Sequence, residues 1–218
     1  MTAGLRPGPI GTERLSLVPL AVEHAREMAV VLGDPALHAF IGGAPSTEAD
    51  LRVRYARMVG GSPDPGVAWC NWVLRLGAEG EERAGRAGGA GRAEGVEAVG
   101  RAGGVERVRD GERVRDAGGV LVGTVQATVT AAAPGSGPGR GGVAEIAWVV
   151  GTPWQGRGFA SEAARGLVRW LEVRGVGTVI AHIHPDHHAS AAVARACGLT
   201  PTTVWHDGEV RWERRVGW

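Results

Sequence analysis

Residues 144–170 read AEIAWVVGTPWQGRGFASEAARGLVRW, and this stretch decides the fold. It opens with the apolar, β-forming run Ile146–Val150, which predicts a strand. Gly151-Thr152-Pro153 ends that strand, because Pro153 has no N–H to donate to a sheet. Apolar residues then recur at helical spacing on one face: Ala160, Ala163, Ala164, Leu167, Val168 and Leu171. The stretch therefore predicts a strand, a glycine-rich turn and an amphipathic helix.

The turn between strand and helix has the composition of an anion-binding loop. It consists of Gln155, Gly156, Arg157, Gly158, Phe159 and Ala160. Two close glycines let consecutive N–H groups point inward, and the first helical turn adds unpaired N–H donors and the positive end of its dipole. These groups suit a pyrophosphate, and Arg157 adds a positive charge at the mouth. A glycine-rich connection that binds nothing is the alternative.

Three residues of this loop match a known signature. Gln155, Gly158 and Ala160 fit Gln/Arg-x-x-Gly-x-Gly/Ala, the acetyl-CoA motif of the GNAT superfamily of N-acetyltransferases, which the chain therefore resembles. In its ribosomal-protein-alanine acetyltransferase-like (RimJ/RimL-type) branch, Asn-x-x-Ser and then Gly-Phe often follow. Here His187-x-x-Ser190 and Gly198-Leu199 stand in those places. Motifs carry the resemblance over residues 143–199.

The resemblance implies an α/β fold with one acetyltransferase domain over residues 1–218. Its sheet is mixed and mostly antiparallel, with a splayed parallel pair at the cofactor cleft and helices on both faces. The chain's own patterns predict further strands at 12–20, 69–76, 119–130, 176–183, 204–206 and 210–215, and helices at 21–32, after Ser46 or Thr47, and at 189–197. Apolar residues in 119–130 alternate from Leu121 to Val129.

The tract 77–118 differs from the rest in composition. It contains Gly, Ala, Arg, Glu and Val, with no aromatic residue and no sustained apolar period. Such a segment buries too little surface to offset its ordering entropy, so a disordered insertion in a hairpin connection is predicted.

Composition excludes several classes of protein. A net charge of +1 favours neither nucleic acid nor an anionic membrane as a partner. All 24 basic residues are arginine, which excludes a Walker-type phosphate loop and Schiff-base chemistry. No run has the length of a membrane span. Cys70 and Cys197 are predicted to be buried free thiols, which suits a cytoplasmic location.

Acetyl transfer needs a polarised carbonyl, a deprotonated amine and a proton for the leaving thiolate. The resemblance implies that a backbone N–H at Val149 or Val150 polarises the carbonyl, and that pantetheine pairs with the same strand edge. Glu145 is the candidate general base, with a purely structural role as the alternative. Many relatives protonate the thiolate with a tyrosine, but Ala194 stands there, leaving Ser190 or a water.

Histidines concentrate in the next segment, at positions 182, 184, 187 and 188. A metal site is one interpretation of this cluster. The resemblance involves no metal, so none is expected. His187 instead replaces the family's asparagine, where it can donate a hydrogen bond to pantetheine; unlike asparagine, it titrates near neutral pH.

The leading hypothesis is an acetyl-CoA-dependent N-acetyltransferase that uses direct attack by a primary amine in a ternary complex. The missing tyrosine and altered asparagine suggest an alternative, a catalytically inactive acyl-CoA-binding module. A dinucleotide-dependent oxidoreductase is excluded, because Ser161 and His182 stand where its motif needs glycine or alanine and an acid. The acceptor is expected to be a small-molecule amine or a protein N-terminus, and the protein a monomer or homodimer.

Overall fold

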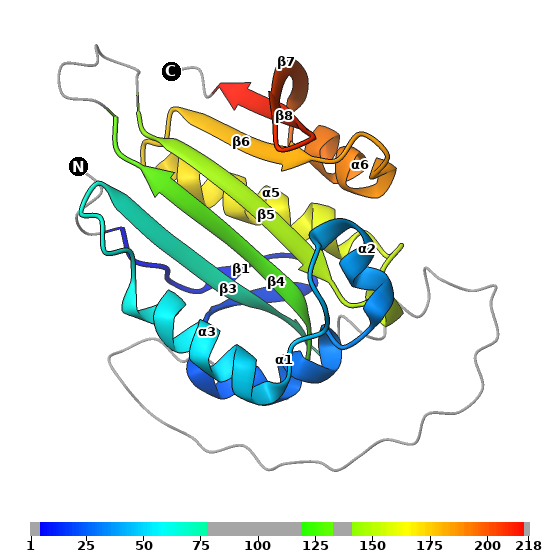
Figure 1. Cartoon of the computed structure of the whole chain (residues 1–218). Helices are drawn as coiled ribbons and strands as arrows, with labels where there is room; N and C mark the ends of the chain where they lie inside the picture. Colours follow the sequence, from blue (N-terminus) through cyan, green and yellow to red (C-terminus); the bar gives the residue numbers. More distant parts are fainter. Residues whose placement is uncertain (1–4, 78–118, 133–140, 216–218) are drawn as a thin grey trace.

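The computed structural model describes residues 5–77, 119–132 and 141–215, so the predicted insertion lies outside them except for Gly77. In these ranges one mixed sheet has the strand order β1-β2-β3-β4-β5-β6-β8-β7 (Figure 1). The strands are β1 (Ile10–Gly11), β2 (Leu15–Pro19), β3 (Val67–Gly77), β4 (Gly119–Thr130), β5 (Val143–Val150), β6 (Thr178–Ile183), β7 (Thr200–His206) and β8 (Glu209–Arg215). The helices are α1 (Ala25–Val31), α2 (His38–Ile41), α3 (Glu48–Gly60), α5 (Phe159–Val173) and α6 (His188–Ala196), with short 3₁₀ turns η1 (Val22–His24), η2 (Pro35–Leu37) and η3 (Thr152–Trp154).

Helices cover both faces of the sheet, as predicted. Helix α5 lies behind it, while α1 and α3 lie on the opposite face (Figure 1). Neighbouring residues of β3 face different cores because side chains alternate along a strand. Trp72 packs into the α5 core, whereas Val73 packs against α1 and α3 with Met28 and Tyr55.

The parallel pair β5–β6 is short. Its pairing runs from Val143–Thr178 to Glu145–Ile180 and then ends. Beyond that point β5 stays paired with β4, while β6 stays paired with β8 as far as Ile183. The two strands therefore diverge from Ile146 onward, which confirms the predicted splayed pair.

A β-bulge interrupts β4 beside this divergence. Its register against β3 shifts between Leu74 and Arg75, so Val122 is the extra residue. Leu121 consequently packs into the α1/α3 core while Val122 packs into the other, and the predicted unbroken alternation is wrong here. The backbone N–H of Leu121 donates to Oε1 of Glu27 on α1 at 2.6 Å, which satisfies a group that the bulge removes from the ladder.

Several element boundaries differ from the prediction for local reasons. Only Leu15–Pro19 of the expected strand 12–20 forms a strand, because the backbone N–H of Thr12 donates to the carbonyl of Leu15 and turns the chain there. Strand β1 lies before this turn and was not predicted. Strand β7 begins at Thr200 despite Pro201, which an edge strand tolerates. Helix α2 was not predicted. Thr47 caps α3, and the Asp207-Gly208 turn has the positive φ values expected of a two-residue hairpin.

Both cysteines are free and buried, as predicted. Burial raises the pKa of Cys70 and of Cys197 to about 11, so both thiols stay protonated and unreactive at neutral pH. No helix among the described residues is long and apolar enough to span a membrane.

Gly77 and Gly119 are direct partners across β3 and β4, so a two-residue turn can join these strands. We expect that replacing residues 78–118 with Asn-Gly leaves the free energy of unfolding equal or higher, since a shorter loop costs less closure entropy. Urea denaturation of both proteins measures this. An insoluble or markedly destabilised deletion variant would show that the tract contributes packing.

Candidate functional site

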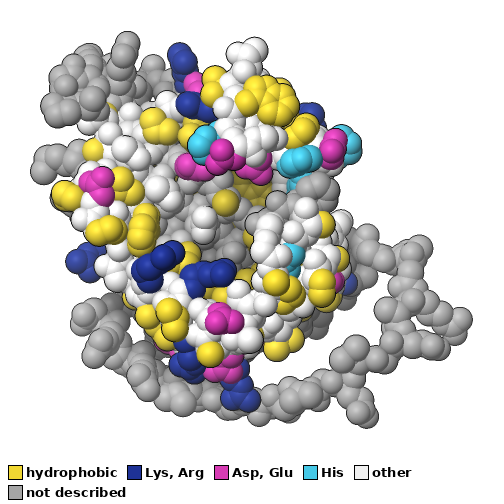
Figure 2. Space-filling view, in the orientation of Figure 1, with side chains coloured by type: hydrophobic (Ala, Val, Ile, Leu, Met, Phe, Trp, Pro, Cys, Tyr) yellow, Lys and Arg dark blue, Asp and Glu magenta, His cyan; other side chains and the backbone are white. Residues whose placement is uncertain are grey.

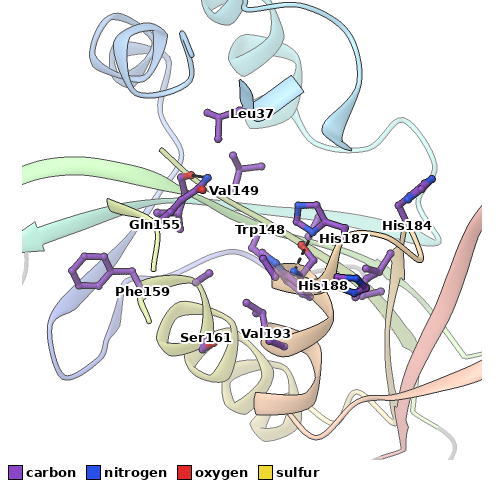
Figure 3. A pocket seen from close by; sticks show the side chains of 18 of the residues that line it. Leu37, Trp148, Val149, Gln155, Phe159, Ser161, His184, His187, His188 and Val193 are labelled. Atoms are coloured by element: carbon purple, nitrogen blue, oxygen red, sulfur yellow. Dashed lines mark hydrogen bonds between the residues drawn. The ribbon is translucent and has the colours of Figure 1, made fainter. Parts of the chain in front are cut away.

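A cleft of about 980 Å³ opens where β5 and β6 diverge. Figure 3 shows Trp148 and Val149 of β5 on one side, His187 and His188 at the start of α6 on another, and Leu37 above. Ten of the eleven predicted site residues line it: Glu145, Val149, Val150, Gln155, Gly156, Gly158, Phe159, Ala160, His187 and Ser190. Arg157 is exposed and does not line the cleft itself, although Gly156 and Gly158 on either side of it do.

The glycine-rich turn has the backbone of an anion cradle. Gly156 has φ 73° and Gly158, the N-cap of α5, has φ 80°, a left-handed conformation that favours glycine. Both line the cleft, so the positive end of α5 faces it. Gln155 Nε2 donates to the carbonyl of Val150 at 3.0 Å and ties the turn to the end of β5.

A buried ion pair supports the cradle from behind. Glu162, in the first turn of α5, is 7% exposed, and its carboxylate accepts from Thr12 Oγ1 at 2.6 Å. It also accepts from the backbone N and the Nε of Arg14, each at 2.7 Å. Arg14 Nη1 donates to the carbonyl of Arg157 at 3.0 Å, and its guanidinium lies 4.7 Å from the ring centroid of Phe159. The turn between β1 and β2 therefore holds the cradle in place.

Burial alone would raise the pKa of Glu162. The hydrogen bonds from Thr12 and from the backbone and side chain of Arg14, with the charge of Arg14, outweigh burial and lower that pKa below its ordinary value. Glu162 is thus a carboxylate in the folded protein. This pair was not predicted from the sequence, because Arg14 and Glu162 are 148 residues apart.

The backbone direction of β5 determines which of its groups face the cleft. The N–H of Gly151 donates to the carbonyl of Val122 on β4 at 2.9 Å. Backbone groups alternate sides along a strand, so those of Val149 also point toward β4, while those of Val150 and Trp148 point toward β6. Of the two predicted oxyanion donors, the register favours Val150.

Glu145 has a specific partner. Its Oε1 lies 2.9 Å from Nδ1 of His182 on β6, where the strands diverge. The His182 side chain is 16% exposed and that of Glu145 is 51% exposed. No sequence pattern indicated His182 as a partner of Glu145. Within the described ranges, no three His, Cys, Asp or Glu side chains come together as metal ligands.

His187 is the N-cap of α6. Its Nδ1 accepts from the backbone N–H of Ser190 at 3.1 Å, so the proton of a neutral ring is on Nε2. Burial lowers the pKa of His187, and the charge of His184 acts in the same direction, although the His187 backbone and Glu209 oppose it. Burial is the largest of these effects and favours a neutral ring.

Two further residues build the wall near α2. Trp154 of η3 lines the cleft and packs against both cores. The Thr152 hydroxyl donates to Asp34 and, with the N–H of Ala36, lowers the pKa of that carboxyl. This bond joins η3 to the loop before α2. Neither contact was predicted, since no local pattern marks either one.

The charges that line the cleft are of one sign. Glu145, Asp186 and Glu209 line it, and no arginine from the described part of the chain does so. Figure 2 shows histidine and acidic side chains gathered beside the hollow. The rim beside β6 and β8 is therefore suited to a cationic molecule.

The chain matches one protein family in sequence. The sequence profile of the family described as acetyltransferase (GNAT) domain matches residues 14–200. No curated protein matches the chain in sequence.

Solved structures share the fold at low identity. A GNAT-family acetyltransferase from Bacillus anthracis is 16% identical, with 95% of this chain and 98% of that chain covered and a TM-score of 0.60. RimL, a ribosomal L7/L12 alpha-N-protein acetyltransferase in complex with coenzyme A, is 14% identical, with coverages of 96% and 98% and a TM-score of 0.60. An aminoglycoside acetyltransferase in complex with coenzyme A is 16% identical, with coverages of 93% and 94% and a TM-score of 0.56.

The Glu162–Arg14 pair predicts a pH-dependent stability. Because the folded pKa of Glu162 is lowered, its contribution is complete above the ordinary carboxyl value of 4.5 and is lost as the pH falls through the folded pKa. Glu162→Gln should lower the free energy of unfolding at pH 7 by about 2 kcal/mol, with the deficit shrinking below about pH 4.5.

Urea titrations at several pH values measure that deficit. Glu48→Gln is the matched control, since Glu48 forms an exposed i,i+4 pair with Arg52 whose loss should cost less than about 0.5 kcal/mol. Equal deficits for the two variants would contradict the structural role of Glu162.

Proposed function

We propose, from the premise that the chain belongs to the acetyltransferase (GNAT) domain family, that it transfers the acetyl group of acetyl-CoA to a primary amine. The amine attacks directly, in a ternary complex. One observation carries the proposal: a left-handed glycine cradle at the N-terminus of α5 follows directly on the open edge of β5. That combination suits a molecule with a pyrophosphate at one end and an amide-bearing arm at the other.

The residues present fit acetyl-CoA as co-substrate. Gly156, Gly158 and the first turn of α5 would hold the pyrophosphate through backbone N–H groups. The edge of β5 from Ile146 to Val150 would pair with the amides of the pantetheine arm. The N–H of Val150 would polarise the thioester carbonyl, and Nε2–H of His187 would donate to pantetheine.

Two polar residues are proposed for proton transfer. Glu145 assists removal of a proton from the acceptor amine. Ser190 donates a proton to the leaving thiolate, directly or through a water. The tyrosine used by many relatives has no counterpart here. Tyr55 lies on α3, 3% exposed in the other core, and burial raises its pKa to about 12.

The charges around the cleft favour a cationic acceptor. Three carboxylates line it without a described arginine, so an anionic amino acid would be repelled and a cationic amine attracted. Small-molecule polyamines and protein N-termini with basic neighbours both meet this requirement. The two free, protonated thiols fit the reducing cytoplasm as the location.

Release of the CoA thiol from acetyl-CoA tests the proposal with a panel of amines. Gly158→Ala should raise the KM for acetyl-CoA by about tenfold or more, because a side chain at the N-cap of α5 keeps the phosphates from the backbone. Gly175→Ala is the matched control: Gly175 has φ 77° and ends α5 far from the cradle, so it carries the same backbone strain without touching the site.

Each outcome of this experiment separates two functions. Turnover with cationic amines, and a KM effect confined to Gly158→Ala, supports the acetyltransferase. A rise in melting temperature with acetyl-CoA but no turnover with any amine supports the inactive acyl-CoA-binding module. Equal stabilisation by ATP would contradict the cradle assignment.

His187 yields a second prediction. His187→Asn should retain most of the acetyl-CoA affinity, because asparagine also caps a helix and can donate a hydrogen bond. His187→Leu should weaken binding by about 1 kcal/mol, roughly fivefold, by losing the donor. Calorimetric titration with acetyl-CoA measures both variants. Unchanged affinity in the leucine variant would remove His187 from the co-substrate site.

A further inference from the structure

The contact between Glu145 and His182 lies at the point where β5 and β6 separate. Glu145 is the last residue of β5 paired with β6, opposite Ile180. His182 is two residues beyond Ile180, so its side chain lies on the same face of the sheet as that of Glu145. Glu145 thus lies at the last paired position of β5, and His182 lies on β6 just beyond the point where the pairing ends.

The geometry determines which nitrogen of His182 carries a proton. Nδ1 lies 2.9 Å from Oε1 of Glu145, and a carboxylate can only accept a hydrogen bond. Nδ1–H therefore donates to Glu145, and the neutral ring keeps its lone pair on Nε2. His182 lines the cleft, and its side chain is 16% exposed, so the residue that carries this basic nitrogen is part of the wall of the cleft.

We propose that His182 is the general base of the reaction and that Glu145 is its positioning residue. This inference rests on the proposed acetyl transfer and revises the part that Glu145 plays in it. From the sequence, the carboxylate of Glu145 was itself the candidate general base, with a structural role as the alternative. A carboxylate whose Oε1 is engaged by an imidazole serves better to fix the ring and to stabilise the imidazolium that forms.

The proton and electron balance of the step is complete. Nε2 of His182 takes one proton from the bound ammonium group, and the freed nitrogen lone pair attacks the thioester carbon. The tetrahedral intermediate collapses by breaking the C–S bond, whose electron pair leaves on sulfur. The second proton of the nitrogen passes to the thiolate through Ser190 or a water, and the imidazolium releases its proton to solvent. The products are the N-acetylated amine and the CoA thiol.

Charged and titratable groups of the neighbouring strands surround His182. Arg211 is its direct partner on β8, and its guanidinium is engaged by Glu213 at 2.7 Å. The His206 ring of β7 lies 5.3 Å from that of His182, tilted by 47°. Other titratable groups line the same cleft: His184, Asp186, His187, His188 and Glu209. Glu145 is the group hydrogen-bonded to the His182 ring.

The experiment measures kcat as a function of pH, with saturating acetyl-CoA and a reactive cationic amine. It also tests whether added imidazole restores activity to a variant that lacks the His182 ring. His182→Ala should lower kcat by about a hundredfold or more, while the shift in melting temperature with acetyl-CoA stays unchanged. Added imidazole should restore a part of that loss. His38→Ala is the matched control, since His38 lies on α2 outside the cleft lining, and imidazole should not affect it.

The pH profile and a second variant separate the roles of the two residues. Wild-type kcat should rise with pH along a limb that His182→Gln lacks, because the base acts only when unprotonated. Glu145→Gln can still accept from Nδ1–H and should lose less kcat than His182→Ala. If Glu145→Gln instead loses more, and imidazole fails to rescue His182→Ala, Glu145 is itself the base and our proposal is wrong.

Failure of the proposed function gives a different result. Wild-type protein without turnover for any amine would reject acetyl transfer as such. Normal wild-type turnover with an unaffected His182→Ala rejects only the assignment of the base.

Discussion

The short pairing of β5 with β6 is the constraint on which the rest of the structure depends. A strand edge in the middle of a sheet carries N–H and C=O groups that need partners. Pairing between the two strands ends at Glu145–Ile180, so the edge of β5 from Ile146 onward faces a cleft instead of a strand. A ligand with its own amides can complete that edge. The divergence thus creates both the space and the hydrogen-bonding capacity of the site.

Support for this opening comes from both faces of the sheet. On the α5 side, the buried carboxylate of Glu162 fixes Arg14 of the N-terminal segment beneath the glycine turn. On the other side, the carboxylate of Glu27 on α1 accepts a hydrogen bond from the backbone N–H of Leu121, which the bulge in β4 leaves without a strand partner. Gly123 lies directly after the bulge, where the backbone of β5 comes close to that of β4. A Cβ at this position would lie 2.2 Å from the carbonyl oxygen of Val149. The cleft is therefore formed by a rigid framework in which charged groups of distant segments fix backbone positions.

Local sequence patterns were sufficient for most of the helices and strands and for the co-substrate end of the site. Gln155, Gly158 and Ala160 form a contiguous motif, and the helical spacing after it is regular, so the strand, cradle and helix were all predictable. The contacts that orient side chains were not predictable from local sequence. Glu145 and His182 are 37 residues apart, and Arg14 and Glu162 are 148 apart, so strand register and topology alone bring them together. The bulge at Val122 was missed because an apolar residue suits either face of a buried strand.

The ends of β3 and β4 have a practical consequence. Gly77 and Gly119 face each other at the end of the sheet where Gly123 pairs with Val150, which is the end that carries the glycine cradle. Paired strand ends lie about 5 Å apart, a separation that many folded domains offer between their own termini. A fluorescent domain inserted at this junction would therefore sit beside the co-substrate end of the cleft, away from the carboxylate-lined rim. The protein could then serve as a biosensor whose emission responds to acyl-CoA while the amine entrance stays open.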